Sequence, residues 1–167
     1  MKKIFCVVVA LLFLCSCGSR EIEPKLTGIS FTASLAYYNE KYVFDGIIDE
    51  NGVLTAQIKE PESLCDLKLT LGPDGTTAEY KGIKYTPVAN SVPFSKIMAE
   101  FYEPLYSIIN SDQVFKSDKD GRIKVGSGTD AVTLTISPSG LPQRLEIPDD
   151  RFYVMLYNLS ICEDVND

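Results

Sequence analysis

The chain has 167 residues, of which 45% are apolar and 23% charged, and a net charge of −7 with no histidine and no tryptophan. This size and composition are typical of one globular domain, and so acidic a surface disfavours nucleic acid as a partner. The lack of histidine excludes Ser-His-Asp and Cys-His catalysis and zinc sites built on histidine.

The N-terminal segment has the pattern of a bacterial lipoprotein leader. After two lysines, Ile4–Leu14 is an unbroken apolar run of 11 residues, which is too short to span a bilayer and typical of a signal peptide. The sequence Leu14-Cys15-Ser16-Cys17 matches a lipobox, in which a large aliphatic residue and two small ones precede the cysteine. We expect cleavage between Ser16 and Cys17 and a diacylglyceryl thioether on Cys17.

These features divide the chain into four parts. Residues 1–16 form the signal peptide, residues 17–25 a lipidated N-terminus and polar tether, residues 26–162 a single domain, and residues 163–167 a polar tail. Two acyl chains on Cys17 would anchor the protein stably in a membrane. The alternative is an ordinary secretory signal with chance cysteines, but the chain lacks an Ala-x-Ala cleavage site.

Beyond the tether, alternating apolar and polar residues predict short strands separated by turn sequences. Asn51-Gly52 is typical of a hairpin turn, since both residues tolerate a positive φ. The turn at 72–75 and the Asp-Gly turn at 118–121 divide further segments. The predicted strands are 29–37, 42–49, 53–59, 64–71, 77–86, 114–116, 122–125, 131–137, 143–147 and 151–159.

One segment, residues 92–110, has helical periodicity. Ser91 is a candidate N-cap and Pro93 suits the first turn. Two adjacent apolar stripes, which start at Ile97 and Met98 and repeat every four residues, give the helix a wide apolar face. Pro104 should kink or split the helix. The predicted fold is therefore α+β, with a strongly curved antiparallel sheet, or half-barrel, and a kinked helix packed in its concave face.

The order of these elements resembles the bacterial lipoprotein-carrier superfamily, which includes the carrier and receptor of the lipoprotein-localisation (Lol) pathway and mycobacterial glycolipid-carrying lipoproteins. The matching stretches are 31–37, 45–58, the break at Glu60-Pro61, the helix at 93–110, and 133–147 with the sequence SGLPQRLEI at 139–147. The resemblance implies a half-barrel whose helix closes an apolar cavity that accepts acyl chains. It does not extend to the arginine in the cavity of the soluble carrier.

An apolar cavity between helix and sheet is the candidate site, and a filled core is the alternative interpretation of the same residues. Cys65 and Cys162 could form a disulfide outside the cell or remain two thiols. The Asp118-x-Asp120-Gly121 sequence indicates a hairpin turn rather than a calcium loop. The candidate cavity residues are Phe31, Leu35, Phe44, Leu67, Phe94, Ile97, Met98, Phe101, Tyr102 and Leu105.

The sequence thus predicts an extracytoplasmic lipoprotein, held on a membrane by the lipid on Cys17, that binds an apolar ligand such as an acyl chain without catalysis. The alternative is a structural or protein-interaction lipoprotein of the cell envelope. We expect no catalytic residue, no cofactor and no metal site, because the chain carries no nucleophile or metal-ligand motif. The sequence indicates neither which membrane carries the protein nor a protein partner.

Overall fold

The computed structural model describes residues 19–86, 93–126, 131–147 and 152–162. The expected signal peptide, the cleavage site at Ser16 and Cys17, the N-cap at Ser91 and the tail at 163–167 lie outside these residues.

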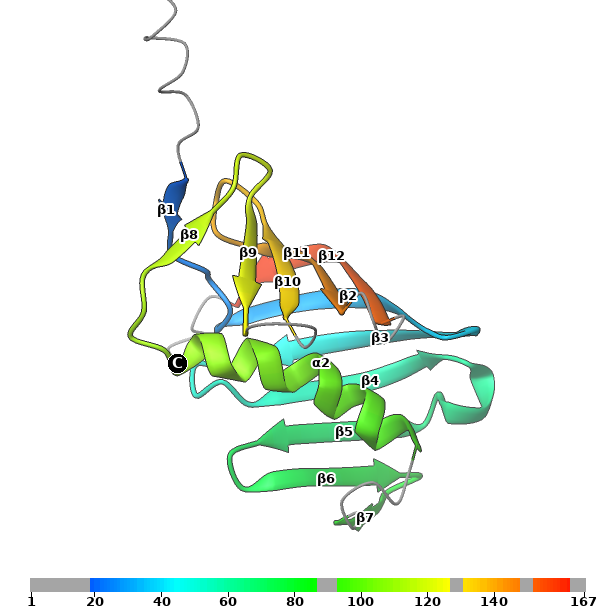
Figure 1. The fold of residues 1–167 in the computed structure, drawn as a ribbon. Helices are drawn as coiled ribbons and strands as arrows, with labels where there is room; N and C mark the ends of the chain where they lie inside the picture. The colour runs from blue at the N-terminus through cyan, green and yellow to red at the C-terminus, as the bar shows by residue number, and fades with distance from the viewer. Residues whose placement is uncertain (1–18, 87–92, 127–130, 148–151, 163–167) are drawn as a thin grey trace, which may run out of the picture.

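The body is one large antiparallel sheet with a single α-helix (Figure 1). Ten strands lie in the order β7-β6-β5-β4-β3-β2-β12-β11-β10-β9, and within the described residues the sheet does not close into a barrel. Their bounds are β2 Ile29–Tyr37, β3 Glu40–Ile48, β4 Leu54–Glu60, β5 Leu67–Gly72, β6 Gly75–Tyr80, β7 Ile83–Tyr85, β9 Arg122–Val125, β10 Val132–Ile136, β11 Pro142–Ile147 and β12 Phe152–Ile161. The prediction of a mainly antiparallel sheet with one helical insertion is confirmed.

The helix α2, Pro93–Ile109, lies across one face of the sheet (Figure 1). It continues through Pro104, so the predicted helix is one element rather than two. Strand β2 has buried residues at every second position, as the alternation predicts. The buried side of the sheet and the apolar face of α2 belong to one core, which extends from Ala78 on β6 to Ile123 on β9.

Local hydrogen bonds explain the hairpins. The Asp49 carboxylate accepts the backbone N–H groups of Asn51 and Val53 at 2.9 and 2.8 Å, while Gly52 takes a φ of 76°. Asp118 likewise accepts the N–H groups of Asp120 and Arg122, which lowers the pKa of its carboxyl group. Asp118 thus closes a tight turn, although the strands on either side of it, Phe115–Ser117 and Arg122–Val125, lie in different sheets and do not form the predicted hairpin. The described residues contain no cluster of acidic, cysteine or histidine side chains fit for a metal ion.

Two predicted boundaries are wrong for local reasons, and one strand is not predicted from the sequence. The strand expected at 77–86 is two strands, because a tight turn at Lys81-Gly82, both with positive φ, separates β6 from β7. The strand expected from residue 64 begins at Leu67, after the 3-10 turn η1, Glu62–Leu64. The polar tether contains a strand, β1 (Arg20–Ile22), which pairs with β8 (Phe115–Ser117) in a second, two-stranded sheet.

Candidate functional site

The N-terminal tether is fixed to the body close to the expected lipid. Strand β1 pairs with β8, the Ser117 hydroxyl donates to the Arg20 carbonyl at 3.2 Å, and the Lys25 N–H donates to the Gly140 carbonyl at 2.9 Å. Only Gly18 and Ser19 separate Cys17 from β1. If all eight residues of the tether after Cys17 were free, Cys17 could lie up to about 28 Å from the body. Because β1 is paired with β8, only three residue steps separate Cys17 from the body, and they span at most about 11 Å.

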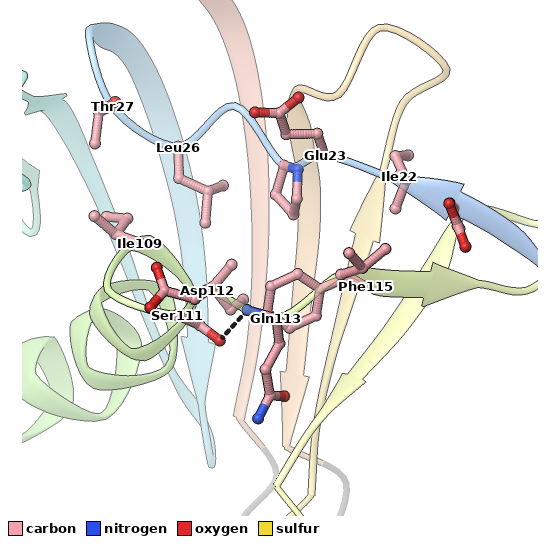
Figure 2. Close-up of a pocket in the computed structure, with 13 residues that line it drawn as sticks. Ile22, Glu23, Leu26, Thr27, Ile109, Ser111, Asp112, Gln113 and Phe115 are labelled. Carbon is pink, nitrogen blue, oxygen red and sulfur yellow. Dashed lines mark hydrogen bonds between the residues drawn. The ribbon is translucent and has the colours of Figure 1, made fainter.

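An open groove of about 550 Å³ lies directly beside this tether. Its two walls are the chain segment that leads from β1 to β2 and the turn that leads from α2 to β8. Figure 2 shows these segments facing one another, with Leu26 and Ile109 on opposite sides. The lining residues are Glu21, Ile22, Glu23, Pro24, Leu26, Thr27, Ile108, Ile109, Ser111, Asp112, Gln113, Val114 and Phe115.

The groove is lined by polar and apolar residues in nearly equal measure, and its charged side chains are negative. Its charged lining residues are the carboxylates Glu21, Glu23 and Asp112, all exposed. Lys116, which is positively charged, lies opposite Glu21 in the β1–β8 pair. The groove therefore suits an apolar group and disfavours one that carries a negative charge. Its size falls within the usual range for ligand sites of roughly 300–1,000 Å³.

The ten candidate cavity residues meet at the helix–sheet interface, as the sequence predicts, and all are buried. The Phe101 ring centroid lies 5.6 Å from that of Phe44 and 6.2 Å from that of Phe31, in edge-to-face geometry. Phe31 and Phe44 are 6.3 Å apart in turn. These are contact distances for packed aromatic rings, so the centre of this interface is occupied by the protein's own side chains.

Two tyrosines at opposite ends of this interface carry buried hydroxyl groups. The Tyr102 hydroxyl donates to the Gly52 carbonyl at 2.7 Å, which ties α2 to the β3–β4 hairpin. Burial raises the pKa of Tyr102 to about 12, with smaller contributions from Tyr106 and Asp49. Burial, with the hydrogen bond to Glu40, raises the pKa of Tyr42 to about 12. Both phenols are therefore neutral hydrogen-bond donors at physiological pH.

The two cysteines do not form the disulfide considered above. Cys65 and Cys162 are free and exposed. Cys65 precedes β5 and Cys162 follows β12, and strands β4, β3 and β2 lie between those two in the sheet. Four strand spacings of about 4.8 Å put roughly 19 Å between them, far beyond the Cα separation that a disulfide allows.

Sequence reasoning missed the groove beside the tether. Its walls come from residues 21–27 and 108–115, which are close only because β1 pairs with β8. The only signal for this pairing is the apolar residue between two glutamates in Glu21-Ile22-Glu23, and so short an alternation is not specific. No helix among the described residues has the length and hydrophobicity needed to cross a bilayer.

Comparison with known proteins does not assign this chain to a family. No protein-family model matches this chain, and no curated protein sequence matches it. The class that the fold defines is an α+β domain with one large antiparallel sheet and one covering helix.

Proposed function

We propose that this protein is a membrane-anchored extracytoplasmic lipoprotein and that its body is a non-catalytic binding module for an apolar ligand, such as an acyl chain. The observation that carries the proposal is the groove beside the tether. Its lining includes the apolar residues Ile22, Leu26 and Ile109, and Ile22 lies close to the lipobox cysteine in the sequence. A lipid on Cys17 would place this groove at the bilayer surface, where single-chain lipids are available.

We also propose the curved form of the fold, a half-barrel with α2 in its concave face and a kink at Pro104. The continuity of the core from β6 to β9 supports the curvature, because buried residues from both halves of the sheet belong to one cluster with those of α2. Pro104 supports the kink, because it has no N–H group to donate a hydrogen bond to the carbonyl group one turn earlier.

Binding to the groove can be tested by native mass spectrometry on the lipidated protein purified in detergent. We expect monopalmitoylglycerol, which is neutral, to add one ligand mass beyond the covalent lipid. A smaller fraction of the protein should bind palmitate, because its carboxylate is repelled by Glu21, Glu23 and Asp112. The variant Ser111→Phe fills the groove and should lose most of the adduct.

The matched control is Ser107→Phe, which adds the same ring at an exposed position outside the groove on α2 and should bind like the parent protein. Equal adducts in both variants, or none in the parent protein, would reject the groove as an acyl-chain site.

The second candidate function is a protein-interaction lipoprotein of the envelope with a filled core. The close packing of Phe31, Phe44 and Phe101 favours it, since it shows that this part of the interface is occupied. This candidate predicts no lipid adduct in any variant. It predicts instead that partner contacts fall on exposed apolar residues of the sheet, such as Ile47, Met155 and Tyr157.

A further inference from the structure

A second concave site lies at the opposite end of β2 from the tether. It is a cleft of about 390 Å³ between the β2–β3 turn and the beginning of α2. We name it the tyrosine cleft, and its lining residues are Tyr37, Tyr38, Asn39, Glu40, Tyr42, Lys96 and Ile97. Because β2 has nine residues, the cleft is roughly 30 Å from the start of that strand. It is therefore separate from the groove of the proposed function.

The turn that forms one wall of the tyrosine cleft is strained. Tyr37 pairs with Glu40, so Tyr38 and Asn39 form a two-residue hairpin turn. Tyr38 has a φ of 52°, at a turn position where glycine or asparagine is favoured and a bulky residue is an outlier. The side chain gains little from burial in return, because it is 59% exposed. Strain of this kind, at an exposed aromatic residue, indicates a function for the ring.

The rings of the cleft form two perpendicular walls. The Tyr37 and Tyr38 ring centroids are 4.8 Å apart and the ring planes meet at 87°. Behind them, Tyr42 is buried against Phe94, with ring centroids 4.8 Å apart. The Tyr37–Tyr38 pair is therefore an edge-to-face contact. Because Tyr38 is 59% exposed, its ring remains open to a cation, which the negative charge of an aromatic face attracts.

The cleft lining carries one negative and one positive side chain, Glu40 and Lys96. The Glu40 carboxylate accepts a hydrogen bond from the Tyr42 hydroxyl, which holds it at the cleft. The only cationic side chain in the lining is Lys96, whose Nζ lies 3.6 Å from the Glu100 carboxylate one turn along the helix. The charge of Lys96 is thus partly neutralised by its own helix. Glu40 supplies the negative charge that a bound cation would face.

We propose that the tyrosine cleft binds a basic side chain, arginine in particular, presented by a peptide segment of an extracytoplasmic partner protein. Arginine fits because its planar guanidinium group stacks on aromatic rings and forms hydrogen bonds with a carboxylate at the same time. The acidic chain, with its net charge of −7, attracts a basic segment at long range. This site does not depend on a ligand in the groove.

The test uses NMR of the full protein with isotope-labelled tyrosine rings, titrated with N-acetyl-arginine amide. We expect the Tyr38 ring signals to shift with saturation. The neutral isostere N-acetyl-citrulline amide should bind at least tenfold more weakly, because it lacks the positive charge. Equal binding of the two probes, or no shift with either, would overturn the proposal.

Two variants separate the proposed role of Tyr38 from a structural one. Tyr38→Asn should weaken arginine binding at least tenfold and raise the melting temperature, because asparagine tolerates the positive φ. Glu40→Gln should weaken binding without that rise. Tyr157→Asn, at an exposed tyrosine outside the cleft, is the control and should bind like the parent protein. Unchanged binding in both Tyr38→Asn and Glu40→Gln, or a lower melting temperature in Tyr38→Asn, would contradict the assignment.

Discussion

Replacing Phe101 by alanine is expected to destabilise the body by about 3–5 kcal/mol, the largest loss that we predict for truncating a single side chain. Phe101 is fully buried and contacts both Phe31 and Phe44 through its ring edges. Truncation removes these contacts and leaves a cavity between helix and sheet. Urea unfolding followed by circular dichroism measures the loss.

The control for Phe101→Ala is Glu103→Ala, which lies on the exposed side of the same helix. It should change the free energy of unfolding by no more than about 0.5 kcal/mol. If Phe101 instead lined an empty ligand cavity, its truncation would cost less than about 3 kcal/mol, because the ring would have fewer contacts to lose. That outcome would contradict the filled interface described above and restore the cavity predicted from the sequence.

Replacing Gly46 by alanine should also destabilise the body, by about 1–3 kcal/mol. A Cβ atom at Gly46 would lie 2.4 Å from the Phe31 ring. The ring cannot move freely, because it packs against Phe44 and Phe101. Thermal unfolding of Gly46→Ala measures the effect, and adding Phe31→Leu should recover part of the loss by making room for the new methyl group.

The comparison position for Gly46 is Gly72, where an added Cβ would meet Val53 at 3.3 Å. Gly72→Ala should therefore cost clearly less than Gly46→Ala. Equal losses would mean that the effect comes from the strand backbone and not from overpacking against Phe31.

Much of the fold follows from local sequence patterns. Strand β2 occupies the residues expected from its alternation, and α2 differs from its predicted range by one residue at each end. Asp49 and Asp118 show why the turn predictions succeed, because each carboxylate accepts hydrogen bonds from the backbone of its own turn. The failures are also local: Lys81-Gly82 turns the chain where the alternation alone suggested a continuous strand.

The candidate sites could be predicted only in part, because they depend on contacts between distant segments. The helix–sheet interface contains the predicted residues, but alternation cannot tell whether Phe101 meets a space or another ring. The groove depends on the pairing of Arg20–Ile22 with Phe115–Ser117, segments too short to carry a recognisable pattern. The tyrosine cleft depends on the φ of one residue, Tyr38, and on the position of α2.

The most direct test of the account is mass spectrometry of the N-terminal peptide of the protein extracted from bacterial membranes. The account predicts that the mature chain begins at Cys17, which carries a diacylglyceryl group, and that Cys17→Ser abolishes both processing at Ser16 and palmitate labelling. A mature chain that begins at another residue, or one whose Cys17 carries no lipid, would contradict membrane anchoring and remove the reason to place the groove at a bilayer surface.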